Sequence, residues 1–148
     1  MNILRVIIGG AGRVGTELAK TLRAEEMDVV LVDSDSRAVK NAQNLDVLVI
    51  HGDLTTREKL NEAGIGEAEI FVAATNSDER NLLACALAEH AHYQYAGSKA
   101  KPLLSISRIR NMNYLEEQKQ GYLTNWAKVN HVVNPLDSAI KRLHTGLR

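Results

Sequence analysis

Short apolar runs alternate along the chain with segments whose apolar residues recur at helical spacing. This alternation is typical of βαβ units, in which crossover helices join parallel strands. The apolar runs predict six strands, at residues 3–8, 29–32, 47–50, 70–74, 103–107 and 131–133. We therefore expect an α/β fold built on a parallel sheet.

Apolar spacing and capping signals mark the helices between these strands. Val14, Leu18 and Leu22 recur at i, i+4 and i+8, which places one apolar stripe of a first helix against the sheet. Two pairs have capping-box spacing, with a capping residue followed three positions later by Glu. These pairs are Thr55 with Glu58 and Asn76 with Glu79, and we expect Thr55 and Asn76 to begin the next two long helices.

The second half of the chain carries weaker signals. Residues 92–102 are polar and include Gly97 and Pro102, so we predict a loop there. A short helix is expected at residues 113–120, and residues 123–129 form a further segment before the last strand.

A clearer helix signal returns at the C-terminal end. Asn134 can cap a helix and Pro135 fits its first position. An apolar stripe follows at Leu136, Ala139, Ile140, Leu143 and Leu147. We therefore divide the chain into a domain at residues 1–134 and a C-terminal helix at residues 135–148.

Length and composition fit one globular domain rather than a disordered, fibrous or disulfide-rich chain. The chain has 148 residues, of which 45% are hydrophobic and 24% charged, with a formal net charge of zero. The charge is unevenly spread, because residues 1–92 hold 9 basic and 15 acidic side chains whereas residues 93–148 hold 9 and 3. The basic second half of the chain is compatible with an anionic partner. It lacks the interleaved aromatic residues of a base-stacking platform, so we expect no nucleic acid.

The cysteine, the histidines and the length of the apolar runs argue against a disulfide, a metal site and a membrane span. The single cysteine, Cys85, excludes an intrachain disulfide, and its apolar neighbours predict a core residue. His90 and His92 are two positions apart and would face different sides of a helix. We therefore predict no metal site and expect the histidines to be solvated or to cap helices. No apolar run reaches the roughly 18 residues of a membrane span, so we expect a cytoplasmic domain without membrane insertion.

The first predicted strand runs directly into a glycine-rich loop. Gly10, Gly12 and Gly15 form a G-x-G-x-x-G pattern between a strand and a helix, as in dinucleotide-binding folds. The first glycine permits a tight turn, the second leaves room for a diphosphate, and the third lets the helix approach the sheet. Free N–H groups at the helix start favour a phosphate. The candidate phosphate-binding residues are Gly10, Ala11, Gly12, Arg13, Val14 and Gly15.

Two side chains near this loop have their own candidate roles. Asp33 ends the second strand 18 residues after Gly15, where a carboxylate can accept hydrogen bonds from ribose hydroxyls and would repel a 2′-phosphate. The alternative is that the glycines only form a turn and that Asp33 caps the next helix. Arg13 can reach phosphate oxygens with bidentate geometry; its alternative is a solvated surface position. These features predict a Rossmann-like doubly wound parallel sheet of six strands in the order 3-2-1-4-5-6.

Further motifs make the sequence resemble a known family, the N-terminal domain of TrkA-type potassium-uptake regulators, also called the RCK or KTN domain. The resemblance covers nearly the whole chain. It rests on the glycine loop, Val32-Asp33-Ser34-Asp35, Gly52-Asp53-Leu54-Thr55, Leu60-Asn61-Glu62-Ala63-Gly64-Ile65, Ala73-Ala74-Thr75-Asn76-Ser77-Asp78-Glu79 with Asn81, and Arg108.

The resemblance implies a regulatory domain, not an enzyme, that binds one adenine nucleotide, NAD(H) or ATP, ADP or AMP, and gates a potassium channel or transporter. By position, it implies that Asp53 lies near the adenine and that Thr75 and Asn76 lie near the ribose or phosphates. Arg108 would lie near the phosphates or a neighbouring subunit. Beyond the glycine loop, the candidate binding residues are Asp33, Ser34, Asp53, Leu54, Ala74, Thr75, Asn76 and Arg108.

The resemblance also implies partners. They are a second copy of the chain, in a homodimer or higher homo-oligomer, and a membrane potassium channel or transporter subunit that holds the domain at the inner face of the membrane. The helix at residues 135–148 would be the dimerisation element. The alternative for its residues Leu136, Ile140 and Leu143 is packing onto the sheet of the same chain.

A small NAD-dependent oxidoreductase of Rossmann type is the alternative function. Tyr95 and Lys99 match the Tyr-x-x-x-Lys pair of short-chain dehydrogenases, in which the lysine assists proton transfer by the tyrosine. Here the pair lies beside Gly97 and Pro102 in a predicted polar loop, and little chain follows to build a substrate pocket. We therefore favour the regulatory domain.

Overall fold

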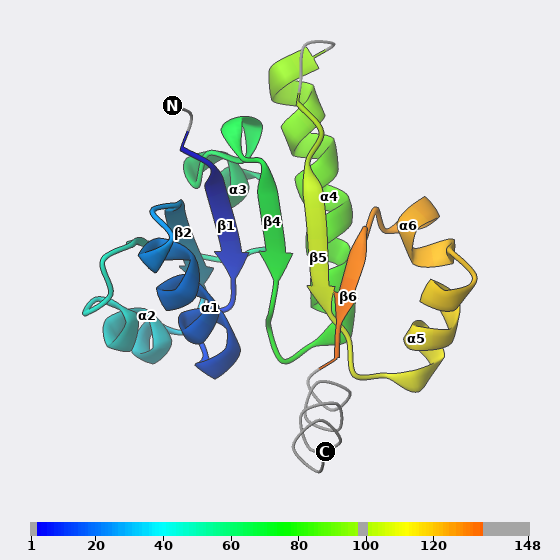
Figure 1. The fold of residues 1–148 in the computed structure, drawn as a ribbon, viewed down its shortest axis with the longest axis horizontal. Helices are drawn as coiled ribbons and strands as arrows, with labels where there is room; N and C mark the ends of the chain where they lie inside the picture. Colours follow the sequence, from blue (N-terminus) through cyan, green and yellow to red (C-terminus); the bar gives the residue numbers. More distant parts are fainter. Residues whose placement is uncertain (1–2, 98–100, 135–148) are drawn as a thin grey trace.

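A twisted parallel sheet forms the centre of the computed structural model, which describes residues 3–97 and 101–134 (Figure 1). The strand order is β3-β2-β1-β4-β5-β6, and every neighbouring pair is parallel. The strands are β1 Arg5–Gly9, β2 Asp28–Asp33, β3 Leu48–His51, β4 Ile70–Ala73, β5 Leu104–Arg108 and β6 His131–Val133. The predicted fold and strand order are confirmed.

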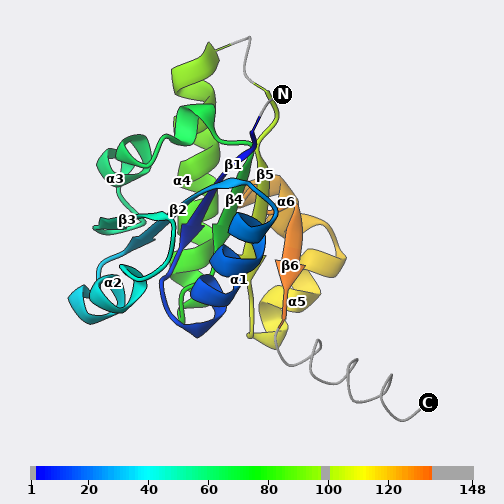
Figure 2. The same ribbon diagram turned by 60° about the vertical axis from the view of Figure 1, so that its left-hand side comes forward.

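Helices cover both faces of this sheet (Figure 2). They are α1 Arg13–Ala24, α2 Ser36–Ala42, α3 Arg57–Glu62, the 3-10 helix η1 Ile65–Glu67, α4 Asp78–Ala96, α5 Met112–Lys119 and α6 Tyr122–Trp126. Helices α1 and α2 pack on one face, and α3, η1 and α4 pack on the other. The connections after β1 and β4 therefore leave on opposite sides of the sheet.

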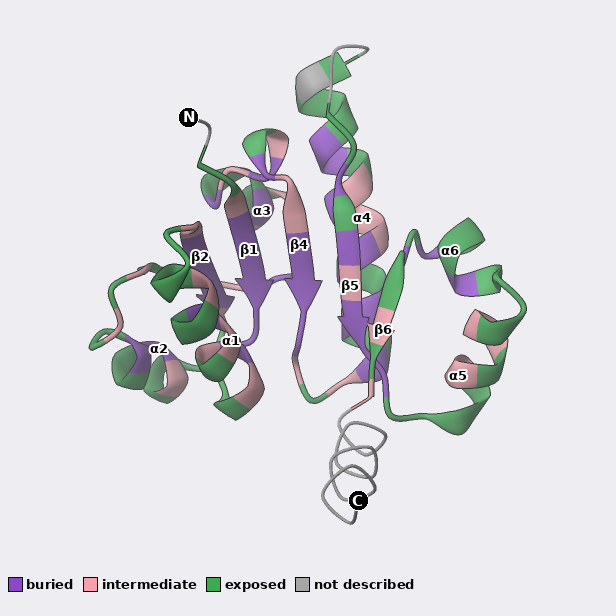
Figure 3. Cartoon of the chain, in the orientation of Figure 1, coloured by how far each residue is buried: buried purple, intermediate pink, exposed green. Residues whose placement is uncertain are grey.

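Alternate residues of the strands pack into two separate hydrophobic cores, one on each face of the sheet. In β1, Val6 and Ile8 join the layer beneath α1 and α2, whereas Ile7 joins Phe71 and Leu60 in the layer beneath α3 and α4. All five of these side chains are at most 5% exposed, and the central strands are buried almost throughout (Figure 3). Each such side chain contributes about 1.5–3 kcal/mol through burial. Burial on both faces explains why the strands read as continuous apolar runs.

Helix α3 begins one residue later than predicted. Thr56 is its cap, and the Thr56 hydroxyl accepts a hydrogen bond from the Lys59 N–H at 3.4 Å. The prediction of Thr55 was wrong because both its N–H and its hydroxyl donate to Asp53, at 2.9 and 2.7 Å. A local turn around that carboxylate therefore precedes the helix.

Helix α4 also begins one residue later than its capping-box pattern predicts. Ser77 is the cap and accepts from the Arg80 N–H at 3.2 Å. The prediction of Asn76 was wrong because its side-chain oxygen accepts a hydrogen bond from Arg108, at 3.1 Å, across the edge of the sheet. The Asn76 side chain, which the local pattern assigns to the cap, therefore forms a long-range hydrogen bond with Arg108 instead.

The C-terminal half of α4 occupies part of the predicted loop. The helix continues to Ala96 and ends at Gly97, whose φ is +63°. His92 is 1% exposed, and its ring nitrogens lie 2.7 Å from the Ile65 carbonyl and 2.6 Å from the Lys101 carbonyl. The expectation of a solvated or capping histidine was wrong here, because the ring is buried and both of its nitrogens lie close to backbone carbonyls.

Residues 109–129 complete the core beside β5 and β6. Asn111 caps α5 by accepting from the Asn113 N–H at 2.8 Å, and Leu123 of α6 is fully buried.

Cys85 is a core residue, as predicted, and burial raises the pKa of its thiol to about 12. The predicted helix at residues 135–148 lies outside the described residues. None of the helices in the described part of the chain is long and apolar enough to cross a membrane.

Candidate functional site

A cavity of about 600 Å³ opens at the carboxyl edge of the sheet. It lies where the chain leaves β1 toward one face and β4 toward the other, the position at which doubly wound folds bind ligands. Eleven of the fourteen candidate residues line it: Gly10, Gly12, Arg13, Val14, Asp33, Ser34, Leu54, Ala74, Thr75, Asn76 and Arg108. The candidates Ala11, Gly15 and Asp53 do not. The lining also includes five residues that were not among the candidate binding residues: Val32, Asp35, Ala38, Arg80 and Arg110.

The glycine loop leaves its backbone open to this cavity. A Cβ atom built on Gly12 meets nothing within 4 Å, so the space beside this backbone is free for a ligand. Gly12 is the cap of α1 and has no side chain to satisfy the first N–H groups of the helix, which therefore remain available to an anion. Gly15 has a structural role, because its Cβ would lie 1.8 Å from the Gly10 carbonyl oxygen.

Asp33 connects the glycine loop to the end of β2. One carboxylate oxygen accepts from the Ala11 N–H at 2.7 Å and the other from the Asp35 N–H at 2.8 Å. A carboxylate has about four acceptor positions, so capacity remains for two ribose hydroxyls. The alternative of a capping role for Asp33 was wrong, because Asp35 caps α2 by accepting from the Arg37 N–H at 2.9 Å.

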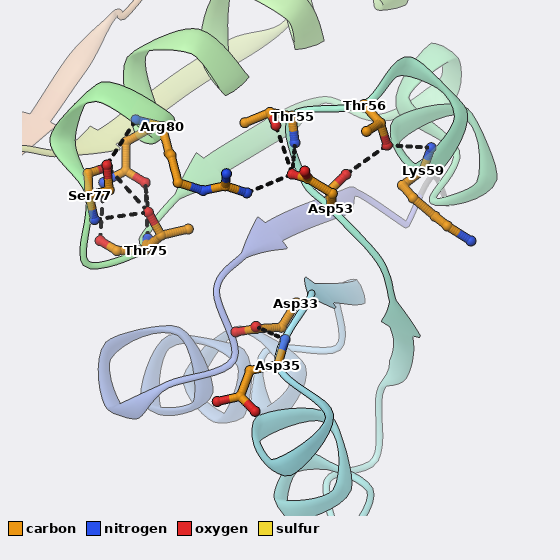
Figure 4. A network of polar contacts seen from close by, with 10 residues as sticks. Asp33, Asp35, Asp53, Thr55, Thr56, Lys59, Thr75, Ser77 and Arg80 are labelled. Atoms are coloured by element: carbon orange, nitrogen blue, oxygen red, sulfur yellow. Dashed lines mark hydrogen bonds and ion pairs between the residues drawn. The ribbon is translucent and has the colours of Figure 1, made fainter.

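Asp53 faces a neighbouring arginine rather than the cavity (Figure 4). Its carboxylate accepts from Thr55 and from the Arg80 guanidinium, the latter at 2.6 Å. The Thr55 hydrogen bonds, and secondarily Arg80, hold the pKa of Asp53 below its ordinary value. The ion pair joins the loop after β3 to the first turn of α4, while the adjacent Leu54 lines the cavity.

Two buried side chains in the first turns of α4 hold the opposite wall. Asn81 is fully buried, accepts from the Thr75 N–H and hydroxyl at 3.0 and 2.6 Å, and donates to the Arg108 carbonyl at 2.9 Å. Asp78 is 9% exposed and accepts from the backbone N–H groups of Arg110 and Asn111, the latter at 2.7 Å. These bonds fix the end of β5 against the loop after β4.

Arg108 is the most deeply buried cation of this wall. It is 9% exposed, and its Nη1 donates to the Asn76 side chain at 3.1 Å. Its buried Nε has no hydrogen-bond partner among the described residues. Burial, followed by repulsion from Arg110, lowers the pKa of Arg108. A buried donor without a partner costs about 1–3 kcal/mol, so this guanidinium favours an added anionic acceptor.

The cavity lining is cationic although the first two-thirds of the sequence is acidic. Four arginines face two carboxylates in the lining, Asp33 and Asp35, a net charge of +2. Arg80 had a signal in the sequence. It lies in the first turn of α4, where the helix dipole disfavours a cation, so a cation there suggests a role other than helix stability. Arg110 had none, since only the packing of the loop after β5 brings it to the cavity. Open space at Gly12, unused acceptors on Asp33 and the cationic lining together suit a ligand that carries phosphates and hydroxyl groups.

Tyr95 of the dehydrogenase-like pair lies away from the cavity. Tyr95 is 68% exposed, at the opposite end of α4 from Ser77, about 27 Å along the helix. Its ring lies against Gly66 and its hydroxyl is 3.5 Å from a Glu67 oxygen, beyond the amino edge of the sheet. Lys99 lies outside the described residues. Tyr95 therefore does not face the cavity.

No group of three or more His, Cys, Asp or Glu side chains in residues 3–97 and 101–134 is arranged to hold a metal ion.

The chain is similar to known proteins over most of its length. Residues 6–135 match the TrkA-N domain family. The chain is 34% identical to the Trk system potassium uptake protein TrkA of Haemophilus influenzae over 89% of its own length and 27% of that protein's. It is 37% identical to the TrkA homolog of Methanothermobacter thermautotrophicus, over 88% of the chain and 54% of the relative. The chain thus spans about a quarter to a half of these relatives.

Solved structures share the fold. The TrkA-N domain of the Escherichia coli inner membrane protein ybaL superposes with a TM-score of 0.78 at 18% identity, covering 99% of this chain and 98% of that one. The GsuK channel bound to NAD gives a TM-score of 0.68 at 16% identity, covering 89% and 21%. GsuK bound to ADP gives 0.70 at 22% identity, covering 95% and 33%. Because the family match covers most of the sequence and relatives exceed 30% identity over most of it, this chain belongs to the TrkA-N domain family.

Proposed function

We propose that this chain is an adenine-nucleotide-binding regulatory domain of a potassium uptake system, and that it acts by binding rather than by catalysis. The observation that carries the proposal is the cavity at the switch point of the sheet. It combines open backbone at Gly12, a ribose-type carboxylate at Asp33 and a surplus of arginines.

Each part of the lining has a role in this proposal. The Gly12 backbone and the first turn of α1 bind the diphosphate through N–H groups. Asp33 binds ribose hydroxyls with the acceptor positions that Ala11 and Asp35 leave free. Arg13 and Arg108 add charge-assisted hydrogen bonds to phosphate oxygens. The adenine lies toward Leu54, beside the Asp53–Arg80 ion pair.

The names of the relatives support the wider role. TrkA proteins are named for potassium uptake, and GsuK is a channel whose solved structures include complexes with NAD and with ADP. By analogy, the nucleotide changes the geometry of an assembly of two or more copies of this domain. That change is passed to a membrane potassium channel or transporter subunit, with the domain at the cytoplasmic face.

The oxidoreductase alternative receives no support from the cavity. Tyr95 lies at the far end of α4, and the polar side chains of the lining are Arg, Asp, Ser, Thr and Asn. These groups bind and orient a charged ligand. The lining contains no tyrosine, lysine, histidine or cysteine, and its two carboxylates, Asp33 and Asp35, already accept hydrogen bonds from backbone N–H groups.

Isothermal titration calorimetry of the chain with ATP, ADP, AMP, NADH and NAD⁺ tests the proposal. We expect binding of at least one of them, and Asp33→Ala should weaken every ribose-containing ligand by about tenfold. Asp46→Ala is the matched control, because Asp46 is an exposed carboxylate at the opposite edge of the sheet. Absence of binding by all five ligands at millimolar concentration would refute the proposal.

A further inference from the structure

The cavity has two chemically different ends. Asp33 ends β2 and Asp35 follows it, the glycine loop follows β1, and Arg108 ends β5 and is followed by Arg110. In the sheet these strands stand in the order β2-β1-β4-β5. Because neighbouring strands are about 4.8 Å apart, the β2 and β5 backbones that carry these side chains are about 14 Å from each other. A ligand lying across this edge therefore meets carboxylates at one end and guanidiniums at the other.

The basic end is only partly neutralised, because Asp78 attracts the charge of Arg108 without forming a salt bridge with it. Within the described part of the chain, neither Arg108 nor Arg110 forms an ion pair, whereas Arg80 is paired with Asp53. The nearby Asp78 carboxylate is used by two backbone N–H groups and does not line the cavity. The two guanidiniums thus remain available to an anion from outside the chain.

Arg108 supplies a second, independent sign of a missing acceptor. Its side chain is buried at the cavity wall, and its Nε has no hydrogen-bond partner among the described residues. Asn76 satisfies only one of its donors, at Nη1. A planar guanidinium matches phosphate with two parallel hydrogen bonds, so a terminal phosphate would satisfy this side chain.

A nicotinamide dinucleotide would place a different group at this end. In doubly wound folds the second nucleoside of a dinucleotide lies beyond the diphosphate, across the switch point and toward the second half of the sheet. The oxidised nicotinamide ring is a cation. Two guanidiniums without carboxylate partners repel it, whereas the uncharged reduced ring is repelled less.

We propose that the β5 end of the cavity is a terminal-phosphate subsite formed by Arg108 and Arg110, through which the chain selects nucleoside di- and triphosphates over oxidised nicotinamide dinucleotide. The proposal rests on the nucleotide-binding function proposed above and specifies its ligand class. The order of affinity is ADP and ATP first, then NADH, then NAD⁺.

Calorimetric titration of the 148-residue chain at one ionic strength tests the subsite. The ligands are ATP, ADP, AMP, NADH and NAD⁺, and the variants are Arg108→Gln and Arg110→Gln. ADP should bind the unaltered chain about tenfold or more tightly than NAD⁺. Each variant should lose about five- to tenfold in ADP and ATP affinity, with AMP changed less than about twofold and NAD⁺ unchanged or tighter.

The control variant is Arg23→Gln, which removes one positive charge at the opposite edge of the sheet, where Arg23 faces Asp46. It should leave all five affinities unchanged, and thermal unfolding should show that each variant is folded. Tighter binding of NAD⁺ than of ADP, or an equal loss for AMP and ADP in the arginine variants, would overturn the subsite and leave the nucleotide-binding function intact. If none of the five ligands binds, both proposals fail.

Discussion

The two walls of the cavity are built in different ways. The wall at the ends of β1 and β2, residues 9–15 and 32–35, is held by backbone geometry and by Asp33. The wall at the ends of β4 and β5, residues 74–81 and 108–111, is held by buried polar side chains of α4, above all Asn81. The first wall tolerates changes wherever the backbone is free. The second depends on a few hydrogen bonds between segments distant in sequence.

The largest effect should come from overpacking the first wall. In Gly15→Val, the Cβ would lie 1.8 Å from the Gly10 carbonyl oxygen, so α1 must move away from the turn. We expect a loss of about 3 kcal/mol or more in the free energy of unfolding, measured in urea. Gly12→Ala is the matched control, since its Cβ meets nothing within 4 Å. It should cost less than about 1 kcal/mol yet weaken nucleotide binding. Equal destabilisation by both variants would contradict this account of the glycine loop.

Asn81→Ala should be next in size and tests the second wall. It leaves the Thr75 N–H and the Arg108 carbonyl without their buried partner. We expect a loss of about 2–3 kcal/mol in chemical denaturation, because unsatisfied buried groups carry their full desolvation cost. Asn41→Ala, at an exposed position on α2, should change stability by less than about 0.5 kcal/mol. A loss of similar size in both variants would argue against the buried network.

Asp78→Asn should have a moderate effect that reaches the ligand. The amide is a weaker acceptor than the carboxylate for the N–H groups of Arg110 and Asn111. We expect a cost of about 1–2 kcal/mol in stability and a several-fold loss of ADP affinity, because the loop after β5 carries Arg110. Asp46→Asn, at a side chain 88% exposed, is the control and should alter neither quantity. Unchanged ADP affinity in Asp78→Asn would show that this carboxylate does not position the basic end.

The smallest effect is expected at the exposed ion pair between Asp53 and Arg80. The side chains are 43% and 44% exposed, so solvent screening limits the pair to about 0–1 kcal/mol. Hydrogen bonds from Thr55 and the contact with Arg80 lower the pKa of Asp53 in the folded chain. The stabilisation is therefore fully present above the ordinary carboxyl pKa and is lost as pH falls through the lowered value.

Urea denaturation of the unaltered chain and Asp53→Asn at several pH values measures this contribution. The difference between them should be present at pH 7 and disappear in strong acid. A difference that grows as the pH falls would have the wrong sign for this carboxylate.

The sequence alone determined the six strands, their order and most of the first wall. Strands buried on both faces must be apolar throughout, and a tight strand-to-helix turn beside a phosphate must use glycine, so both leave local patterns. Asp33 was found in the same way, because it ends a strand at a set distance from the loop. Its hydrogen bonds to the Ala11 and Asp35 N–H groups were not foreseen.

Tertiary structure decided the second wall. Local spacing assigned Asn76 to a helix cap, but Arg108, from another strand, binds its side chain. The polar residues from His92 onward predicted a loop, but α4 continues to Ala96, and the buried His92 ring lies against two backbone carbonyls. Arg110 lines the cavity, and Asp78 accepts hydrogen bonds from its backbone N–H. Most of these contacts join residues about 30 positions apart, so their energy depends on packing that no local pattern encodes. The lining has a net positive charge although residues 1–92 are acidic overall. The positive surplus comes from Arg108 and Arg110, which these contacts place at the cavity.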